Sequence, residues 1–305
     1  MNSKKRIVSV DLTIVTSNRT PQGGNLRSEH GLSALLEVEW SDLDFRTMLF
    51  DTGASGEVLE HNLAELEVLV GDLDWVILSH SHSDHTGGLQ WLLSQPGADF
   101  VVVSHPEIDR AVYKTEPSLQ FSGMSCEALG DLGPDRWVRT SSPLRLEPGV
   151  WVTGEIPRQN DFELPRKSMI RLLDGRSRVD GEIDDLAAVL DLGDSGSIVV
   201  AGCCHAGVVN TTLAAREILP DRPVRAVVGG FHLYNAEQNV LRETGEELHK
   251  LVDGGVISGH CTGKRGEDAL DEVFGERHRT FYSGDVWRFD ADVEEWTCPA
   301  DVSPR

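Results

Sequence analysis

The chain has 305 residues, of which 39% are hydrophobic and 26% are charged, a composition typical of a globular protein with one or two α/β domains. Its formal net charge at pH 7 is −22. So acidic a surface repels nucleic-acid phosphates, so we expect no nucleic-acid partner. No apolar run approaches the roughly 18 residues that a membrane helix needs, so we expect no membrane partner.

The cysteines give a first indication of the compartment. They are odd in number and widely spaced, which does not suggest a disulfide framework: Cys126, Cys203, Cys204, Cys261 and Cys298. Residues 1–17 lack the apolar core of a signal peptide. These features predict a cytoplasmic protein. The acidity itself has two open explanations, ordinary solubility and adaptation to high salt.

The first half of the chain alternates between strand and helix patterns. Period-two alternation predicts strands, and helical spacing without Gly or Pro predicts helices. The expected elements are strands at 7–17, 33–40 and 45–50, a helix at 57–67, a short buried strand at 75–78, a helix at 87–95 and a strand that begins at 100.

The second half repeats this order. Its expected elements are strands at 149–156, 187–192 and 197–201, a helix at 208–219, a strand at 224–230, a helix at 237–252 and a strand that begins at 256. The alternation favours an α/β layered fold. We expect a single domain over 1–305 whose two halves, a divergent duplication, meet near 150. The segment 107–150, rich in Pro, Gly, Ser and Asp, is expected to be an insertion or a lid.

Residues 80–88 read HSHSDHTGG, directly after the apolar strand at 75–78. His80 and His82 are two positions apart, so in an extended segment both imidazoles point the same way and can reach one ion. Asp84 and His85 follow where the chain turns toward a helix, so they can serve a second ion. Imidazole and carboxylate suit Zn²⁺, and also Fe or Mn. The two glycines permit a tight turn with close packing at the helix start.

This stretch resembles the H-x-H-x-D-H signature of the metallo-β-lactamase fold, and the resemblance extends over roughly residues 5–285. The resemblance implies an α/β fold of four layers, an αββα sandwich with a metal site at one edge. Further stretches are similar to a subgroup described as 7,8-dihydropterin-6-ylmethyl-4-(β-D-ribofuranosyl)aminobenzene-5′-phosphate synthase-like metal-dependent hydrolases: EHGLS at 29–33, LFDTG at 49–53, GCCHAG at 202–207, GGFHL at 229–233 and HCTG at 260–263.

The resemblance also implies the metal ligands. His80 and His82 bind the first metal, for which His205 is the most natural remaining ligand. The second metal takes Asp84, His85 and His260. The expected cofactor is therefore one or two Zn²⁺ ions, with Fe or Mn as alternatives.

One departure from the family concerns the ligand that bridges the two metals. Most members place an aspartate after the strand at 197–201, whereas this chain has Cys203 there. The second site then either loses a hard ligand or gains a thiolate. One- and two-metal centres both remain open.

Two residues are candidate catalytic groups. In the family the residue at Asp84 orients the nucleophile or accepts its proton. His232 ends a strand on the expected site face and is interpreted as a substrate or oxyanion contact, with a structural turn as the alternative. Asp51 either orients a ligand histidine through its free ring nitrogen or caps the turn.

The remaining candidates are less sharply defined. His30, His105 and Glu155 are left open as residues near the site. Cys261 is expected to pack rather than bind metal. We expect three histidines in helical or charged contexts on the surface: His61, His249 and His278.

A metal held by histidines with an open position makes water a nucleophile at neutral pH. We therefore expect a metal-dependent hydrolase acting on a small-molecule ester, foremost a phosphoester or phosphodiester, with a homo-oligomer left open. A basic rim must then offset the acidic surface, and its expected members are Arg158, Arg166, Lys167 and Lys264. The alternatives are a lactone or thioester hydrolase of the same fold, and a low-turnover metal-containing ligand-binding or sensor protein.

Overall fold

A computed structural model describes residues 5–125, 130, 132–133, 135–173 and 176–293. Cys126 and Cys298 lie outside these ranges, as does part of the segment 107–150. The three cysteines within them, Cys203, Cys204 and Cys261, are free thiols. No helix in the described ranges is long and apolar enough to cross a membrane.

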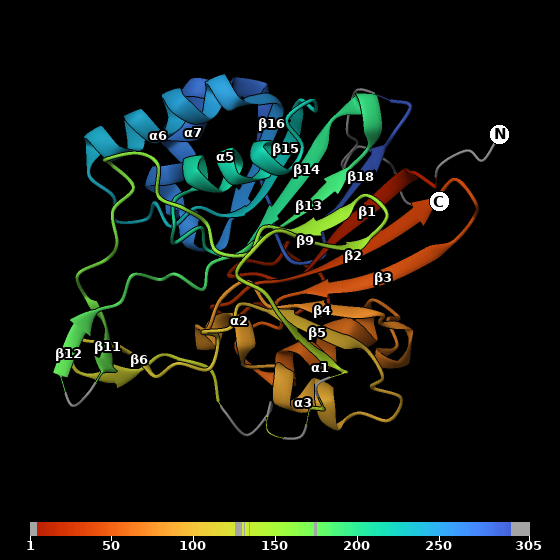
Figure 1. Ribbon diagram of the computed structural model, residues 1–305, viewed down its shortest axis with the longest axis horizontal. Coiled ribbons are helices and arrows are strands. Elements are labelled where there is room, and N and C mark those ends of the chain that lie inside the picture. The colour runs from red at the N-terminus through yellow and green to blue at the C-terminus, as the bar shows by residue number, and fades with distance from the viewer. Residues whose placement is uncertain (1–4, 126–129, 131, 134, 174–175, 294–305) are drawn as a thin grey trace.

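Two seven-stranded sheets form the body of the molecule (Figure 1). The first has the order β18-β1-β2-β3-β4-β5-β8. Its strands are β1 Ile7–Thr16, β2 Ser33–Trp40, β3 Phe45–Phe50, β4 Trp75–Ile77, β5 Val101–Ser104, β8 Trp137–Arg139 and β18 Val286–Asp290. Strands β3, β4, β5 and β8 run parallel. The late strand β18 returns to pair with β1, which no local sequence pattern predicts.

The second sheet has the order β17-β16-β15-β14-β13-β10-β9. Its strands are β9 Leu144–Glu147, β10 Val150–Val152, β13 Ala187–Asp191, β14 Ser197–Ala201, β15 Val224–Gly230, β16 Val252–Gly259 and β17 His278–Thr280. Strands β14 to β17 run parallel. The chain passes from the first sheet to the second between β8 and β9. The expected duplication of two halves stays a prediction.

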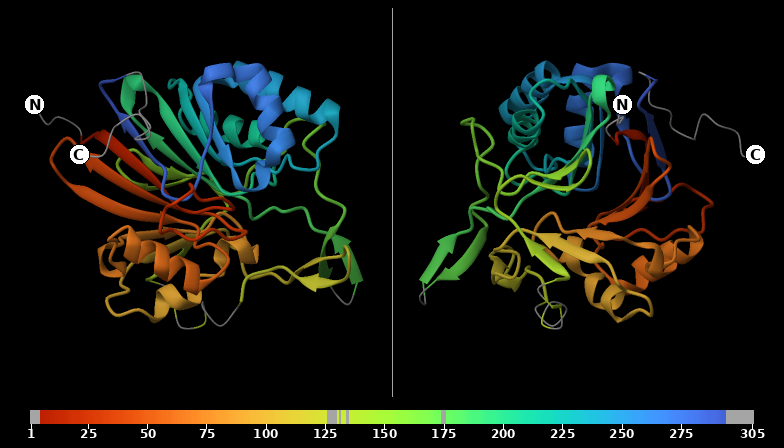
Figure 2. Two further views of the ribbon diagram at one scale, coloured as in Figure 1. Left: turned by 180° about the vertical axis from the view of Figure 1, so that it is seen from behind. Right: turned by 45° about the vertical axis from the view of Figure 1, so that its right-hand side comes forward.

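Alternating side chains build the layers. In β14, Ile198 and Val200 belong to the core between the sheets, whereas Val199 and Ala201 belong to the core under the helices. Helices α1 Gly56–Glu65 and α3 Leu89–Ser94 pack on the first sheet, and α5 Val208–Ile218, α6 Gln238–Leu251 and α7 Gly263–Phe274 pack on the second. Figures 1 and 2 show helices on both outer faces. The expected four-layer αββα sandwich is confirmed.

Several short helical turns connect the longer elements. They are α2 Ser83–Thr86, η1 Val70–Asp72, η2 Gly193–Ser195, η3 His260–Thr262 and η4 Gly275–Arg277. The predicted helix at 87–95 corresponds to α3, which begins after the two glycines, and α2 is a separate turn before them.

A small third sheet projects from the body as an arm (Figures 1 and 2). It has the order β12-β11-β6-β7, with β6 Val112–Lys114, β7 Gln120–Phe121, β11 Met169–Leu173 and β12 Arg176–Val179. The segment 107–150 therefore contributes β6 and β7 to the arm and β8 and β9 to the main sheets. That it acts as a lid stays a prediction.

The expectation that His278 is a surface residue is wrong. Its side chain is buried, because β17 is the edge strand that α7 covers. The ring nitrogens are satisfied by Ser258 Oγ at 2.9 Å and Asp271 Oδ1 at 2.6 Å. His249 is exposed as expected, and His61 is half-buried.

A buried acidic loop, residues 180–185 with the sequence DGEIDD, lies between β12 and β13. Arg110 binds both Asp180 Oδ2, at 2.9 Å, and Asp184 Oδ1, at 2.6 Å. The other Asp184 oxygen accepts the N–H of Ser81 at 2.7 Å. The loop thus contacts Arg110, just before β6 of the arm, and also Ser81 in the histidine-rich stretch after β4. Its acidic run looks like a solvated turn in the sequence, and nothing in it signals burial.

The last residue of the acidic loop holds a second strand-end loop. Asp185 Oδ2 accepts the N–H of Ala206 at 2.8 Å. The pKa of the Asp185 carboxyl is raised to about 7, chiefly by burial. The Ala206 N–H lowers this pKa, whereas the negative charges of Asp184 and Glu182 raise it further.

We predict that Asp185→Asn removes a pH dependence of stability from the metal-free protein. The folded pKa lies above the unfolded value, so this group stabilises the fold at low pH and that contribution is lost as pH rises from about 4 to about 7. Asparagine keeps an oxygen acceptor for Ala206 and does not titrate. The unfolding free energy of the variant minus that of the wild type should therefore increase by on the order of 2–3 kcal/mol from pH 5 to pH 8.

Urea denaturation at both pH values measures this difference. Asp268→Asn is the control, since that carboxylate is exposed on α7. If the unfolding free energies of wild type and Asp185→Asn differ by the same amount at pH 5 and pH 8, the raised pKa of Asp185 is contradicted.

Candidate metal centre

The candidate centre forms where parallel strands of both sheets end. Ligands in open α/β sheets bind outside the carboxyl ends of the strands. The HSHSDHTGG stretch follows β4, and Cys203 and His205 follow β14. His232 follows β15 and His260 follows β16. The chain packs tightly after the stretch, since a Cβ on Gly88 would lie 2.3 Å from Thr52 O.

Several of these strand ends place a non-glycine residue in the left-handed region. The φ angles are 59° for Asp51 after β3, 51° for Cys204 after β14, 48° for His232 after β15 and 49° for His260 after β16. Such backbone conformations cost of order 1–3 kcal/mol each and persist where surrounding structure fixes them. These four conformations all occur just after the strands β3, β14, β15 and β16, where the candidate ligands gather.

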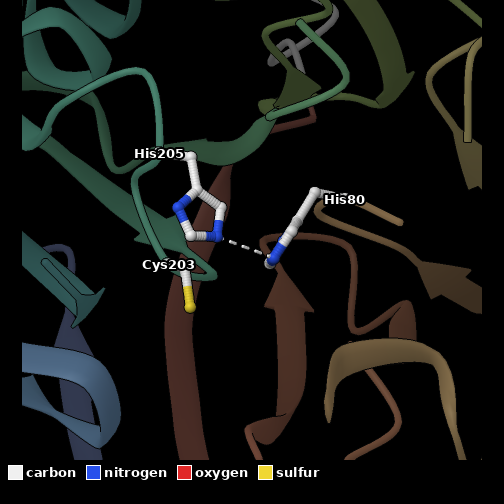
Figure 3. A group of neighbouring side chains, drawn as sticks. All are labelled: His80, Cys203 and His205. Atoms are coloured by element: carbon white, nitrogen blue, oxygen red, sulfur yellow. Dashed lines mark hydrogen bonds between the residues drawn. The ribbon is translucent and has the colours of Figure 1, made fainter. Parts of the chain in front are cut away.

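His80, His82 and His205 form a compact group of ring nitrogens. The distances are 2.9 Å between His80 Nε2 and His82 Nδ1, 3.0 Å between His82 Nδ1 and His205 Nε2, and 3.1 Å between His205 Nε2 and His80 Nε2. Figure 3 shows the rings of His80 and His205 meeting across the site. A tetrahedral zinc ion with Zn–N bonds of about 2.0–2.1 Å separates its nitrogens by roughly 3.3 Å. The group therefore fits one metal ion.

These three imidazoles are neutral. Burial lowers the pKa of His80 and of His205 well below the usual histidine range, and neighbouring histidines and Arg166 lower it further. Burial, followed by the charge of Arg166, lowers the pKa of His82 to about 4. Neutral imidazole is the form that binds metal, so the lone pairs are available at neutral pH.

Asp84, His85, His260 and Cys203 form a second group beside the first. Asp84 Oδ2 lies 3.5 Å from His260 Nε2 and 3.9 Å from His85 Nε2. Cys203 Sγ lies 3.0 Å from His85 Nε2. Among the described residues, His260 Nε2 is a buried atom without a hydrogen-bond partner. A buried polar atom without a partner is costly, and a metal ion at this point would satisfy it.

Asp51 and Ser79 fix the orientation of two histidines. Asp51 Oδ2 accepts from His85 Nδ1 at 2.6 Å and from Ser79 Oγ at 2.7 Å. Ser79 Oγ in turn lies 2.8 Å from His80 Nδ1 and accepts its proton. Both histidines therefore direct Nε2 toward the centre. Of the two roles expected for Asp51, the histidine contact is present.

Asn18 and His30 reach the second group from the loop between β1 and β2. Asn18 Oδ1 accepts from His260 Nδ1 at 2.8 Å, which leaves Nε2 of His260 free to face Asp84. His30 Nε2 lies 3.3 Å from Asp84 Oδ2, so this open candidate does lie at the site. Nothing in the local sequence identifies Asn18, because its role depends on a contact with His260, 242 positions away.

The charges of the second group differ from those of the first. Burial lowers the pKa of His85, but Asp51 and Asp84 outweigh it and raise that pKa to about 9. Burial and the charge of His85 lower the pKa of His260 to about 3. Although burial raises the pKa of Asp84, the neighbouring histidines hold it well below its usual range. Asp84 is therefore a carboxylate at neutral pH, the form that binds a cation.

His232 lies beside the first group and is held by Arg166. Its ring centroid is 4.6 Å from that of His205, and its Nε2 accepts from Arg166 Nη1 at 2.8 Å. Arg166 is held in turn by Glu182 of the acidic loop, whose Oε1 lies 2.9 Å from Arg166 Nε. A chain of contacts thus links the acidic loop to the site face, and His232 as a substrate contact stays a prediction.

A cavity of about 460 Å³ opens beside both groups. Its lining includes His82, Asp84, Cys203, His205, His232 and His260 together with Lys114, Met169 and Tyr234. Two cations face it, Arg166 and Lys114, and Lys114 comes from β6 of the arm. The sequence pattern did not identify Lys114, since it lies in a segment without a clear period.

The expected basic rim is only partly correct. Of its four members, only Arg166 is among the residues that line the cavity. Arg158 is engaged by the carbonyl oxygens of Glu163 and His205, both at 2.7 Å. Lys264 is paired with Asp268 on the exposed face of α7.

His105 and Glu155 form their own pair away from this cavity. His105 Nε2 lies 3.8 Å from Glu155 Oε2, and neither residue lines the cavity. Cys261, in contrast, does line it, and its Sγ accepts the N–H of His232 at 3.3 Å.

The donor sets fit two adjacent divalent metal ions. The first set offers three neutral imidazole nitrogens. The second offers the imidazoles of His85 and His260 and a carboxylate, and His85 would release its Nε2 proton on binding a metal. Cys203 has its sulfur within 4.8 Å of ring nitrogens of both sets. Nitrogen, oxygen and thiolate donors together suit Zn²⁺ and Fe more than Mg²⁺ or Ca²⁺.

Comparison with known proteins gives the same family as the signature. A model of the metallo-beta-lactamase superfamily matches residues 44–158. A 7,8-dihydropterin-6-methyl-4-(beta-D-ribofuranosyl)-aminobenzene-5′-phosphate synthase of Methanocaldococcus jannaschii is 34% identical over 269 residues, which are 86% of this chain and 90% of the relative. An uncharacterized protein of the same organism is 26% identical over 246 residues, covering 81% of this chain and 89% of the relative.

Solved structures agree on the fold. A metal-dependent hydrolase of the beta-lactamase superfamily has a TM-score of 0.76 at 24% identity, covering 92% of this chain and 99% of that chain. A diphosphatase from the PhnP family has a TM-score of 0.51 at 13% identity, covering 93% and 98%. The match to the synthase extends over most of both chains, and the fold is shared with the hydrolase structure. This chain belongs to the metallo-β-lactamase superfamily, whose members bind divalent metals.

Proposed function

We propose that the chain is a metal-dependent hydrolase of a small phosphorylated molecule, a phosphoester or phosphodiester. The observation that carries this proposal is Arg166, a cation whose side chain is only 25% exposed and which lines the cavity beside the ligand groups. A guanidinium at such a place suits a phosphate, because its terminal nitrogens each carry a second N–H beyond those bound to Glu182 and His232.

The proposed metal ligands are the residues of the two donor sets. His80, His82 and His205 would hold the first ion, and Asp84, His85 and His260 the second. Such ions lower the pKa of a bound water from about 15.7 to about 7 and polarise a phosphoryl oxygen.

Asp84 has a second proposed role, in orienting the attacking water or accepting its proton. The carboxylate is ionised at neutral pH, and its Oδ2 lies between His30, His85 and His260. It also lines the cavity, so one oxygen can serve the second ion while the carboxylate remains within reach of a water molecule.

Lys114 and Arg166 would bind the phosphate oxygens that do not react. They differ in mobility, because Arg166 is held by Glu182 and His232 whereas Lys114 is exposed on the arm. The net charge of −22 repels an anionic substrate at long range. Two cations at the cavity offset this repulsion only at short range, so the arm is proposed to contribute to substrate binding.

A synthase activity is the second candidate, and the 34% identical relative favours it. The name of that relative describes a product with a 5′-phosphate on a ribofuranosyl group. A phosphorylated pterin precursor would use the same cations as a simple phosphoester. If the substrate were a lactone or thioester, Arg166 would have no phosphate to bind. If the protein were a low-turnover sensor, Asp84 would have no catalytic role.

We predict that Asp84→Asn strongly slows hydrolysis in the metal-loaded protein. The wild type should hydrolyse bis(p-nitrophenyl) phosphate, and the variant should lose roughly 10²–10⁴-fold in kcat, because it loses an ionised group that handles the proton. Elemental mass spectrometry counts the metals per chain in the variant. Fewer metals than in wild type would mean that a ligand was lost, whereas an unchanged count would mean that a base was lost.

The substrate panel for this experiment includes p-nitrophenyl phosphate, p-nitrophenyl acetate, a lactone and a thioester. Turnover of only the uncharged esters would replace the phosphoester proposal with the lactone or thioester alternative. A wild type that holds two metals and turns over none of these esters would favour the synthase or the sensor.

We also predict that Lys114→Gln raises KM for an anionic ester about 3–10-fold with little change in kcat, because uniform binding of a charged group is lost. The KM for p-nitrophenyl acetate should not change. Lys264→Gln is the matched control, since Lys264 is exposed and lies outside the cavity lining. Equal effects of the two lysine variants would exclude a specific role for the arm.

A further inference from the structure

The residue at the meeting point of the two donor sets is Cys203. It follows Gly202 at the end of β14, and its side chain is buried at 2% exposure. Figure 3 shows it on the same loop as His205, below the ring of that histidine and across from His80. No other described cysteine shares ligand groups with both sets.

The shared position follows from the distances. Cys203 Sγ lies within 4.8 Å of ring nitrogens of His80 and His205, and equally of His85 and His260. Its contact with His85 Nε2 is 3.0 Å. A sulfur on one side of the site would approach only one pair. This sulfur approaches both, so it lies between the places where the two ions would be bound.

The backbone around Cys203 leaves little freedom to move that sulfur. A Cβ on Gly202 would lie 2.1 Å from Ser79 Oγ, so the chain is pressed against the loop after β4. The N–H of Gly230 donates to Gly202 O at 2.8 Å. On the other side, Cys204 occupies the left-handed region with φ 51° and packs into the core under the helices.

A sulfur bridge is compatible with the size of a two-metal centre. Metal–sulfur bonds of about 2.3 Å span at most roughly 4.6 Å across one bridging atom, and the ions of such centres lie about 3.5–4 Å apart. A thiolate carries enough lone pairs to bind both ions. Its negative charge also reduces the repulsion between two dications in a buried site.

We propose that the Cys203 thiolate is a bridging ligand shared by the two metal ions. The proposal deepens the proposed hydrolase function, because it concerns the same centre. A soft bridging donor has a consequence for metal choice. It favours Zn²⁺, Fe²⁺ or Co²⁺ over Mn²⁺, which prefers oxygen donors.

The test replaces the native ions with Co²⁺, because a cobalt–thiolate bond gives a sulfur-to-metal charge-transfer band in the near ultraviolet. Wild type should bind about two Co²⁺ per chain and show this band. Cys203→Ser should lose the band. Cys203→Asp, which supplies an oxygen bridge, should also lose it while still binding about two ions.

Two neighbouring cysteines provide controls. Cys204→Ser should keep the band, because Cys204 packs into the core under the helices. Cys261→Ser should keep it too, although Cys261 lines the cavity and lies near Cys203. Loss of the band in Cys261→Ser but not in Cys203→Ser would overturn the assignment, as would a wild type with two Co²⁺ ions and no band.

Competition between metals gives a second readout that is independent of activity. With equal Co²⁺ and Mn²⁺, Cys203→Asp should shift the bound ratio toward Mn²⁺ by about tenfold or more relative to wild type. An unchanged ratio would contradict a bridging sulfur. If Cys203→Ser fails to fold, which thermal unfolding reports, Cys203→Asp carries the test alone.

These outcomes separate this proposal from the proposed function. A protein with two ions and phosphodiester turnover but no thiolate band keeps the function and loses the bridge. A protein with the band but without hydrolysis of any ester keeps the bridge and loses the function.

Discussion

Three imidazole nitrogens meet within 3.1 Å of one another in a buried space, and the rest of the structure depends on holding them there. Neutral nitrogens so close repel through their lone pairs unless a proton or a cation lies between them. Burial and neighbouring positive charge disfavour protons on these rings, as the lowered pKa values show. A divalent cation is the partner that satisfies all three at once, so the apparent crowding is the form of a ligand set.

Holding such a set requires rigid support, which comes from two sources. Strand ends with left-handed residues aim the side chains, as at His232 and His260. The acidic loop 180–185 then fixes the connecting loops by accepting the N–H groups of Ser81 and Ala206. Its carboxylates are balanced by Arg110 and Arg166, so the buried charges are paired rather than isolated. The same loop therefore fixes the segments that carry the candidate metal ligands and positions Arg166, one of the two cations that line the cavity.

The sequence was sufficient for the parts of the fold that repeat locally. Alternation predicted β1, β2 and β14, and the signature predicted that His80, His82, Asp84 and His85 come together. It was insufficient where a contact spans the chain. The pairing of β18 with β1, the arm that joins β6 to β11, and the Asn18–His260 bond each depend on tertiary packing. The burial of the DGEIDD loop and of His278 was missed because a polar run shows no period, whether it is solvated or paired with buried arginines.

The bridge position shows how one residue can change the chemistry of a shared scaffold. An aspartate there can bridge through two separate oxygens, whereas a cysteine would offer one sulfur to both ions. A single bridging atom restricts the separation of the ions more tightly than a carboxylate does. A bridging thiolate would also place a polarisable, negatively charged donor beside His85, whose second ring nitrogen is already bound to Asp51. Strong donors on both ions reduce their Lewis acidity, so a centre of this kind would depend more on substrate positioning. Arg166 and Lys114 lie at the cavity where such positioning would occur; Lys114 belongs to the arm, and Arg166 is bound by Glu182 of the acidic loop.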